Sequence, residues 1–239
     1  MNKILYAFAL AGVLGLSSCS DFLDQTSPSE MTAENTYASP YYTNLRVNKL
    51  YGGMAQDRTY AQDLSIVWNL NSDCELIDGL GSNATNTSSE RGNMNYNMDP
   101  GWSKISGVWD AEYGIIEDAN QIIEGIRSSA TLTAGGANQK SMERSLGEAL
   151  TIRAMVYFDL VRIFGDIPFK VEASKSDLSN AYLEKTDRDV IMDFLMNDLD
   201  EAIEYLPWAD QATGYTTERT TKGYAHALLA QIAMTRAGY

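Results

Sequence analysis

The sequence predicts a mainly α-helical fold with long irregular loops, and three observations lead to that prediction. Apolar residues recur every three or four positions in several segments, the spacing that gathers them on one face of a helix. Thr or Asp stands where such segments begin, and Gly or Pro stands where they end. Residues 81–102 are rich in Asn, Ser, Thr and Gly and almost free of aliphatic side chains, so they are expected to form a long loop.

The chain begins with a leader. Lys3 supplies a positive charge, residues 4–16 are almost wholly apolar or Gly, and two serines precede Cys19. This order is typical of a secretory signal peptide, and the run is shorter than the about 20 residues that cross a bilayer. A buried core helix is the alternative explanation of the same run.

The Leu-Ser-Ser-Cys sequence that ends at Cys19 resembles the lipobox of bacterial lipoproteins. The resemblance implies cleavage before Cys19 and acylation of that residue, and more than one acyl chain gives lasting attachment. We therefore expect a signal peptide over residues 1–18 and a lipidated tether over residues 19–32. Ser20 and Asp21 resemble the acidic tag that sends Bacteroidetes lipoproteins to the cell surface, which implies an outer-membrane location facing the exterior.

Periodicity and end signals place the helices along the body of the chain. Thr186 is the expected N-cap of one helix, and Pro207 is its stop. An acidic face on that helix is expected to face solvent. The predicted helices cover residues 33–54 with a break at Pro40, 105–126, 142–164, 187–206 and 221–239.

Arg153 falls on an apolar side of the predicted helix 142–164, between Leu160 and Phe164. An unpaired guanidinium in an apolar environment is costly. We therefore predict that Arg153 pairs with a carboxylate or with backbone carbonyls. Small residues in this helix and in the last one indicate close helix crossings of the kind that tetratricopeptide pairs need, at Gly147, Ala149, Ala154, Gly223, Ala225 and Ala230.

Composition and charge limit the classes of function. The chain has 44% hydrophobic and 21% charged residues and a net charge of -14. Nucleic acid is a poor partner for such a surface, whereas an uncharged ligand suits it. With Cys19 used for the anchor, no second cysteine is left to form a disulfide with Cys74, which is expected to be a small buried residue. His226, the single histidine, is expected in the core, and no cofactor or metal motif is present.

Four segments together resemble the SusD/RagB family of surface glycan-binding lipoproteins. They are "WDAEYGIIEDANQIIEGI", "LGEALTIRAMVYFDLVRIFGDIPF", "TDRDVIMDFLMNDLDEAIEYLP" and "RTTKGYAHALLAQIAMTRAGY". The resemblance implies a SusD-like fold with tetratricopeptide-like helix pairs. It also implies a nutrient-binding protein that caps a SusC-like TonB-dependent porin, captures an oligosaccharide and delivers it by closure of a hinged lid, with no bond broken.

Members of that family are roughly twice this long, so the resemblance covers the N-terminal half. Residues 33–239 are expected to form a SusD-like N-terminal helical domain, with the C-terminal half absent. A fragment and a truncated gene both remain open explanations.

The resemblance also suggests ligand contacts in and beside the long loop. Arg91 with Gly92 matches the family's Arg-Gly pair, Asn93 and Tyr96 lie where aromatic and Asn contacts follow, and Asp73 matches an Asp of the preceding segment. Tyr96 stands where a Trp is common. Sugars bind to aromatic faces and to planar polar side chains, so the predicted glycan-binding residues are Asp73, Arg91, Asn93, Tyr96 and Trp102.

Structural roles compete with each of these assignments. Asn and Ser also fold loops without touching a ligand, and Trp102 opens a helix, where it can serve as a core anchor. Trp208 and Tyr215 form a second aromatic loop or pack a helix end. Tyr41 with Tyr42 is a partner-facing pair or, as we expect, a buried helix contact.

Two other classes of protein remain as alternatives. A scaffold or adhesin would bind protein through its helix pairs. A glycoside hydrolase needs two carboxylates that face each other across a sugar, and no pair in the sequence is marked by aromatic neighbours, so catalysis is not expected.

Overall fold

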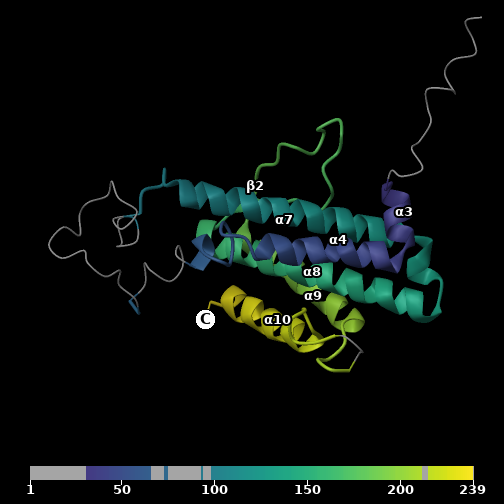
Figure 1. Cartoon of the computed structure of the whole chain (residues 1–239). Coiled ribbons are helices and arrows are strands. Elements are labelled where there is room, and N and C mark those ends of the chain that lie inside the picture. The colour runs from purple at the N-terminus through teal and green to yellow at the C-terminus, as the bar shows by residue number, and fades with distance from the viewer. Residues whose placement is uncertain (1–30, 66–72, 75–92, 94–97, 212–214, 239) are drawn as a thin grey trace, which may run out of the picture.

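The computed structural model describes residues 31–65, 73–74, 93, 98–211 and 215–238, and this part of the chain is mainly helical (Figure 1). The prediction of a mainly α-helical fold is confirmed. The elements are α3 (Ala33–Ala38), α4 (Pro40–Met54), α7 (Ser103–Arg127), η2 (Ala130–Thr133), α8 (Gly136–Phe164), β1 (Ile167–Pro168), β2 (Lys185–Thr186), α9 (Arg188–Tyr205) and α10 (Lys222–Arg236). The signal peptide, Cys19 and most of the tether lie outside the described residues and stay predictions.

The long helices form antiparallel pairs in layers (Figure 1). Helices α4, α7 and α8 run side by side, α9 packs on α8, and α10 packs on α9. Helix α8 is central because it contacts α4, α7 and α9, and its middle turns are buried almost all round. The two short strands pair antiparallel, with Ile167 opposite Thr186, and close the connection from α8 to α9.

Helix ends agree with the sequence in most places and differ in two. Helix α8 begins at Gly136, before the predicted start at Met142. The N-cap of α9 is Asp187 rather than Thr186, because the Asp187 carboxylate accepts a hydrogen bond from Asp189 N at 2.7 Å. Thr186 instead belongs to β2. Thr221 caps α10 by accepting from Tyr224 N at 3.2 Å.

The Arg153 side chain is only 1% exposed and has partners on three other elements. Its Nε and Nη2 both donate to Asp198 Oδ2 on α9, at 2.9 and 2.6 Å. Its Nη1 donates to Asn120 Oδ1 on α7 at 2.8 Å and to the Val171 carbonyl oxygen at 3.3 Å. The predicted pairing with a carboxylate and a carbonyl is confirmed, and one guanidinium joins α7, α8, α9 and the segment after β1.

Close crossings of helices occur where the small residues predicted them. A Cβ added at Gly147 of α8 would lie 2.9 Å from Leu206 Cγ and 3.2 Å from the Ala202 carbonyl oxygen. Gly223 lies against the Trp208 ring. Ala230 differs, because it lies on the exposed side of α10.

Four residues predicted to be buried are exposed. Cys74 lies outside the helices and is exposed. His226 is exposed because α10 packs on α9 through a different face, and its ring stacks on Trp208 at 5.8 Å between centroids. Tyr41 is 67% and Tyr42 is 41% exposed, since the first turns of α4 are covered on one side only.

One buried and one partly buried carboxylate lie between the helices near the start of α7. Glu112 is fully buried, and neither of its carboxylate oxygens has a hydrogen-bond partner in the described part of the chain. Asp159 on α8 accepts a hydrogen bond from the Tyr60 hydroxyl at 2.7 Å. Burial raises the pKa of Glu112 to about 8, and the charge of Asp159 adds to the effect. Glu112 is therefore mainly protonated at neutral pH.

Removing the carboxylate partner of Arg153 is expected to destabilise the fold strongly. Asp198→Ala leaves a buried guanidinium without its counter-charge, and such losses cost about 3 to 5 kcal/mol. The free energy of unfolding in urea measures the change. Asp200→Ala, an exposed position on the same helix, serves as the control and should change stability by less than about 0.5 kcal/mol. Equal effects of the two substitutions would contradict the assignment.

Glu112→Gln is expected to stabilise the protein in a pH-dependent manner. The folded pKa is about 8, above the ordinary 4.5, so the folded state holds a proton that the unfolded state has lost. The stability of the wild type should therefore fall as pH rises from about 5 to about 8, by at most about 1.4 kcal/mol per unit from this group. Urea unfolding at pH 5, 6, 7 and 8 should show the advantage of the variant growing over this window. A constant difference would show that Glu112 does not titrate there, and Glu204→Gln on the exposed face of α9 is the control.

Candidate functional site

The described segments on either side of the predicted ligand loop, residues 55–65 and 98–102, lie at one end of the bundle, where α4 ends and α7 begins (Figure 1). Thr59 closes the end of α4, because its hydroxyl lies within hydrogen-bond distance of the carbonyl oxygens of Met54, at 2.7 Å, and Gly53, at 2.8 Å. Tyr60 is held to α8 through Asp159. The segment that leads into the loop is thus attached to two helices.

An ion pair joins this segment to the first turn of α7. Lys104 Nζ lies 2.5 Å from Asp63 Oδ1, and both side chains are largely buried. A pair shielded from solvent is weakened less by salt than an exposed pair. It fixes the distance between the chain entering the loop and the helix that follows it.

The chain returns to α7 through a turn around Asp99. Asn93 Oδ1 accepts a hydrogen bond from Asp99 N at 2.8 Å, and Asp99 Oδ1 accepts from Gly101 N at 2.8 Å. Trp102 N donates to the Asp99 carbonyl oxygen at 2.9 Å, which sets Trp102 as the N-cap residue of α7. These bonds order the chain immediately before the helix.

The structure places three of the five predicted glycan-binding residues. Asn93 is 6% and Trp102 is 8% exposed, so their side chains support the base of the loop, as the turn and core-anchor alternatives propose. Asp73 is exposed, and the Cys74 thiol lies 3.5 Å from its Oδ1. Arg91 and Tyr96 lie outside the described residues. The assignment of these five residues to glycan binding stays a prediction.

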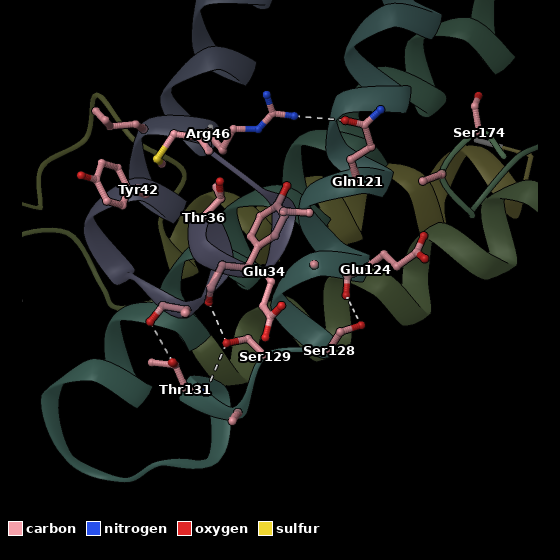
Figure 2. Close-up of a pocket in the computed structure, with 18 residues that line it drawn as sticks. Glu34, Thr36, Tyr42, Arg46, Gln121, Glu124, Ser128, Ser129, Thr131 and Ser174 are labelled. Carbon is pink, nitrogen blue, oxygen red and sulfur yellow. Dashed lines mark hydrogen bonds between the residues drawn. The ribbon is translucent and has the colours of Figure 1, made fainter. Parts of the chain in front are cut away.

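A hollow that the sequence did not indicate lies near the opposite end of α7, with a volume of about 1050 Å³ (Figure 2). Its walls come from α3, the first turns of α4, the end of α7, η2 and the segment after β1. Side chains labelled in Figure 2 point into or around it from these elements, among them Glu34, Tyr42, Arg46, Gln121, Glu124 and Thr131.

Close packing and two hydrogen bonds hold α3 against the other walls. A Cβ at Gly125 of α7 would lie 2.2 Å from the Tyr37 ring, so only glycine permits this approach. The Ser129 hydroxyl donates to the Tyr37 carbonyl oxygen at 2.7 Å, and the Thr131 hydroxyl donates to that of Ala38 at 2.9 Å. The hollow is therefore formed by elements that are fixed to one another.

The polar wall of the hollow is a connected row of side chains. Arg46 Nη2 donates to Gln121 Oε1 at 3.1 Å, and Gln121 Nε2 donates to Glu117 Oε1 at 2.9 Å. Partial burial alone would raise the pKa of Glu117, but hydrogen bonds from Ser174 and Gln121, with the charge of Lys170, hold it below its ordinary value. Glu117 is thus ionised at neutral pH and orients the Gln121 amide.

Two further properties of the described residues bear on function. No group of three His, Cys, Asp or Glu side chains among them is arranged to hold a metal ion. Within the same residues, no helix has the length and apolar character that a membrane crossing requires.

Comparison with known proteins gives one family. A protein family named SusD-like and described as "Starch-binding associating with outer membrane" matches residues 21–234. SusD-like protein P2 of Formosa agariphila is 28% identical over 241 residues, which cover the whole of this chain and 44% of that protein. The chain thus spans less than half the length of this relative.

Solved structures agree with that match. A SusD homologue from Bacteroides thetaiotaomicron superposes with a TM-score of 0.75 and 26% identity, over 87% of this chain and 38% of the other. Surface glycan-binding protein A from Bacteroides fluxus superposes with a TM-score of 0.66, over 84% of this chain and 41% of that protein. The two sequences are 20% identical, so this likeness is evidence for a shared fold only. The mainly helical fold with tetratricopeptide-like pairs is that of these structures. Because the family match covers residues 21–234, most of the length of this chain, the chain belongs to the SusD-like family.

Proposed function

We propose that this chain is part of a cell-surface lipoprotein that binds a nutrient glycan and caps a SusC-like TonB-dependent porin, into which it delivers the ligand. The family match over residues 21–234 carries the proposal, since the family's description combines starch binding with the outer membrane. The relatives are more than twice as long, so the glycan site of the whole protein has contributions from outside this chain.

The ligand contacts of this chain lie in the predicted loop over residues 81–102, with Arg91 and Tyr96 as the side chains that touch sugar. Sugars offer apolar C–H faces for aromatic rings and hydroxyl groups for planar polar side chains. The ion pair of Lys104 with Asp63 and the Asn93 hydrogen bond fix both ends of the loop. Fixing the ends lowers the entropy that the loop loses on binding.

The lipid anchor accounts for the location of the protein. Acylation of Cys19 holds the tether at the outer membrane, and α3 begins at Ala33, 14 residues further on (33 minus 19). A fully extended tether of that length reaches about 45 to 50 Å. The helical body can therefore stand over a porin mouth while the anchor stays in the membrane.

Substitution in the loop is expected to weaken glycan binding. Tyr96→Ala removes an aromatic face and should raise the Kd by about twofold to tenfold, and Arg91→Ala should raise it by about tenfold or more through loss of charged hydrogen bonds. Isothermal titration of the detergent-purified full chain with maltohexaose and laminarihexaose, a fragment of an α-glucan and of a β-glucan, measures both. Tyr182→Ala, at a ring that is 95% exposed, is the matched control.

Other results of the same titration favour the alternatives. Porin copurification without binding of any glycan in a wider panel would favour a protein-binding cap. Release of reducing sugar would favour a hydrolase. Unchanged affinity in both loop variants would remove Arg91 and Tyr96 from the site.

Cys19→Ala is expected to release the protein from the membrane. Without the acceptor thiol there is no acyl chain, and the remaining sequence has no other anchor signal of this kind. Fractionation of cells labelled with a radioactive fatty acid should show label and membrane retention lost together. Cys74→Ala, the matched control, should keep both, and a membrane-bound Cys19→Ala protein would contradict the proposed anchor.

A further inference from the structure

We propose that the hollow between α3, α4 and the end of α7 is a second glycan subsite that binds a short stretch of a neutral oligosaccharide. This inference rests on the proposed glycan-binding function and adds a site that is separate from the loop. Figure 2 shows the hollow with its lining side chains.

The apolar wall offers a surface for the C–H face of a sugar. Tyr42 is 41%, Leu45 is 48% and Met31 is 52% exposed, and all three line the hollow. Large side chains that remain exposed beside a concave polar surface are a common feature of ligand sites. Tyr42 can supply an aromatic face without rearrangement of the core.

The polar wall offers both donors and acceptors. Arg46 Nη2 donates to Gln121 and lies 3.8 Å from Asp118 Oδ1, and a guanidinium has five N–H donors in all. Glu34 and Glu124 present exposed carboxylates that form no ion pair within the described part of the chain. Sugar hydroxyls both donate and accept, so they match this mixture, whereas a hollow lined by two carboxylates and one guanidinium disfavours an anion.

The walls are held in place before any ligand arrives. Tyr37 packs on Gly125, and Ser129 and Thr131 fasten the chain around Tyr37 and Ala38. A preformed site loses little conformational entropy on binding. A weak contact with one or two sugar units is therefore sufficient for measurable affinity.

The hollow and the base of the predicted loop lie near opposite ends of α7. Ser103 opens the helix beside the loop base, and Gly125 lies at the hollow. At about 1.5 Å per residue, the 22 residues between them (125 minus 103) span about 33 Å. A long glycan that contacts both sites gains effective concentration at the second, whereas a short one occupies each site separately.

The test compares loop and hollow variants of the detergent-purified full chain with maltohexaose and laminarihexaose, using saturation-transfer NMR and isothermal titration. The loop variant Arg91→Ala/Tyr96→Ala should retain weak binding of a hexaose. Adding Tyr42→Ala should weaken this residual binding by about twofold to tenfold, and adding Glu124→Ala should weaken it as well. Tyr182→Ala and Glu204→Ala, both at exposed positions, should leave it unchanged in the same background.

Thermal unfolding checks that the hollow variants are folded. Substitutions at these exposed positions are expected to leave the fold intact. If the wild type binds a hexaose but the loop variant binds none, the hollow is not a glycan site and the proposed function stands. Residual binding that persists unchanged after Tyr42→Ala and Glu124→Ala would also show that the hollow is not a glycan site. If the wild type binds neither hexaose nor starch nor laminarin in affinity gels, the proposed function and the hollow both fail.

Discussion

The buried guanidinium of Arg153 is the constraint on which the arrangement of the helices depends. Four donor contacts reach Asp198 on α9, Asn120 on α7 and the Val171 carbonyl oxygen after β1. Apolar packing alone tolerates small shifts of one helix against another, but a guanidinium removed from water does not tolerate the loss of its acceptors. The contacts of Arg153 therefore fix where α7 and α9 lie on the central helix α8.

A fixed bundle determines where the base of the predicted loop and the hollow can lie. Helix α7 links the two ends, since its first turn carries Lys104, paired with Asp63 at the base of the loop, and its last turns carry Gln121 and Gly125 at the hollow. The helices thus act as a spacer that keeps two distant surfaces in constant relation.

The sequence predicted the helices and the pairing of Arg153 because both follow from local periodicity. The charge of Arg153 occurs on an apolar stripe of its own helix, which indicates a buried partner without identifying Asp198. Periodicity along the sequence could not predict which faces of a helix are covered by other elements. His226 and Tyr42 stand in helical patterns that resemble buried ones, yet α10 and the start of α4 are covered on one side only. The hollow escaped prediction because its walls come from segments near residues 31–46, 121–131 and 173–174, which only the fold brings together.

The two buried glutamates show how unevenly the polar groups of the core are satisfied. Glu148 accepts hydrogen bonds from Tyr51 at 2.7 Å and from Arg219 Nε at 2.9 Å, and these oppose the effect of burial on its pKa. Glu112 has no such donor in the described part of the chain and escapes the cost of a buried charge by holding a proton. Its neighbour Asp159 anchors Tyr60, in the segment that leads into the loop. Ionisation of Glu112 would therefore place a second negative charge beside that anchor. A rise in pH is thus expected to destabilise the end of the bundle at the base of the loop rather than the end that carries the hollow.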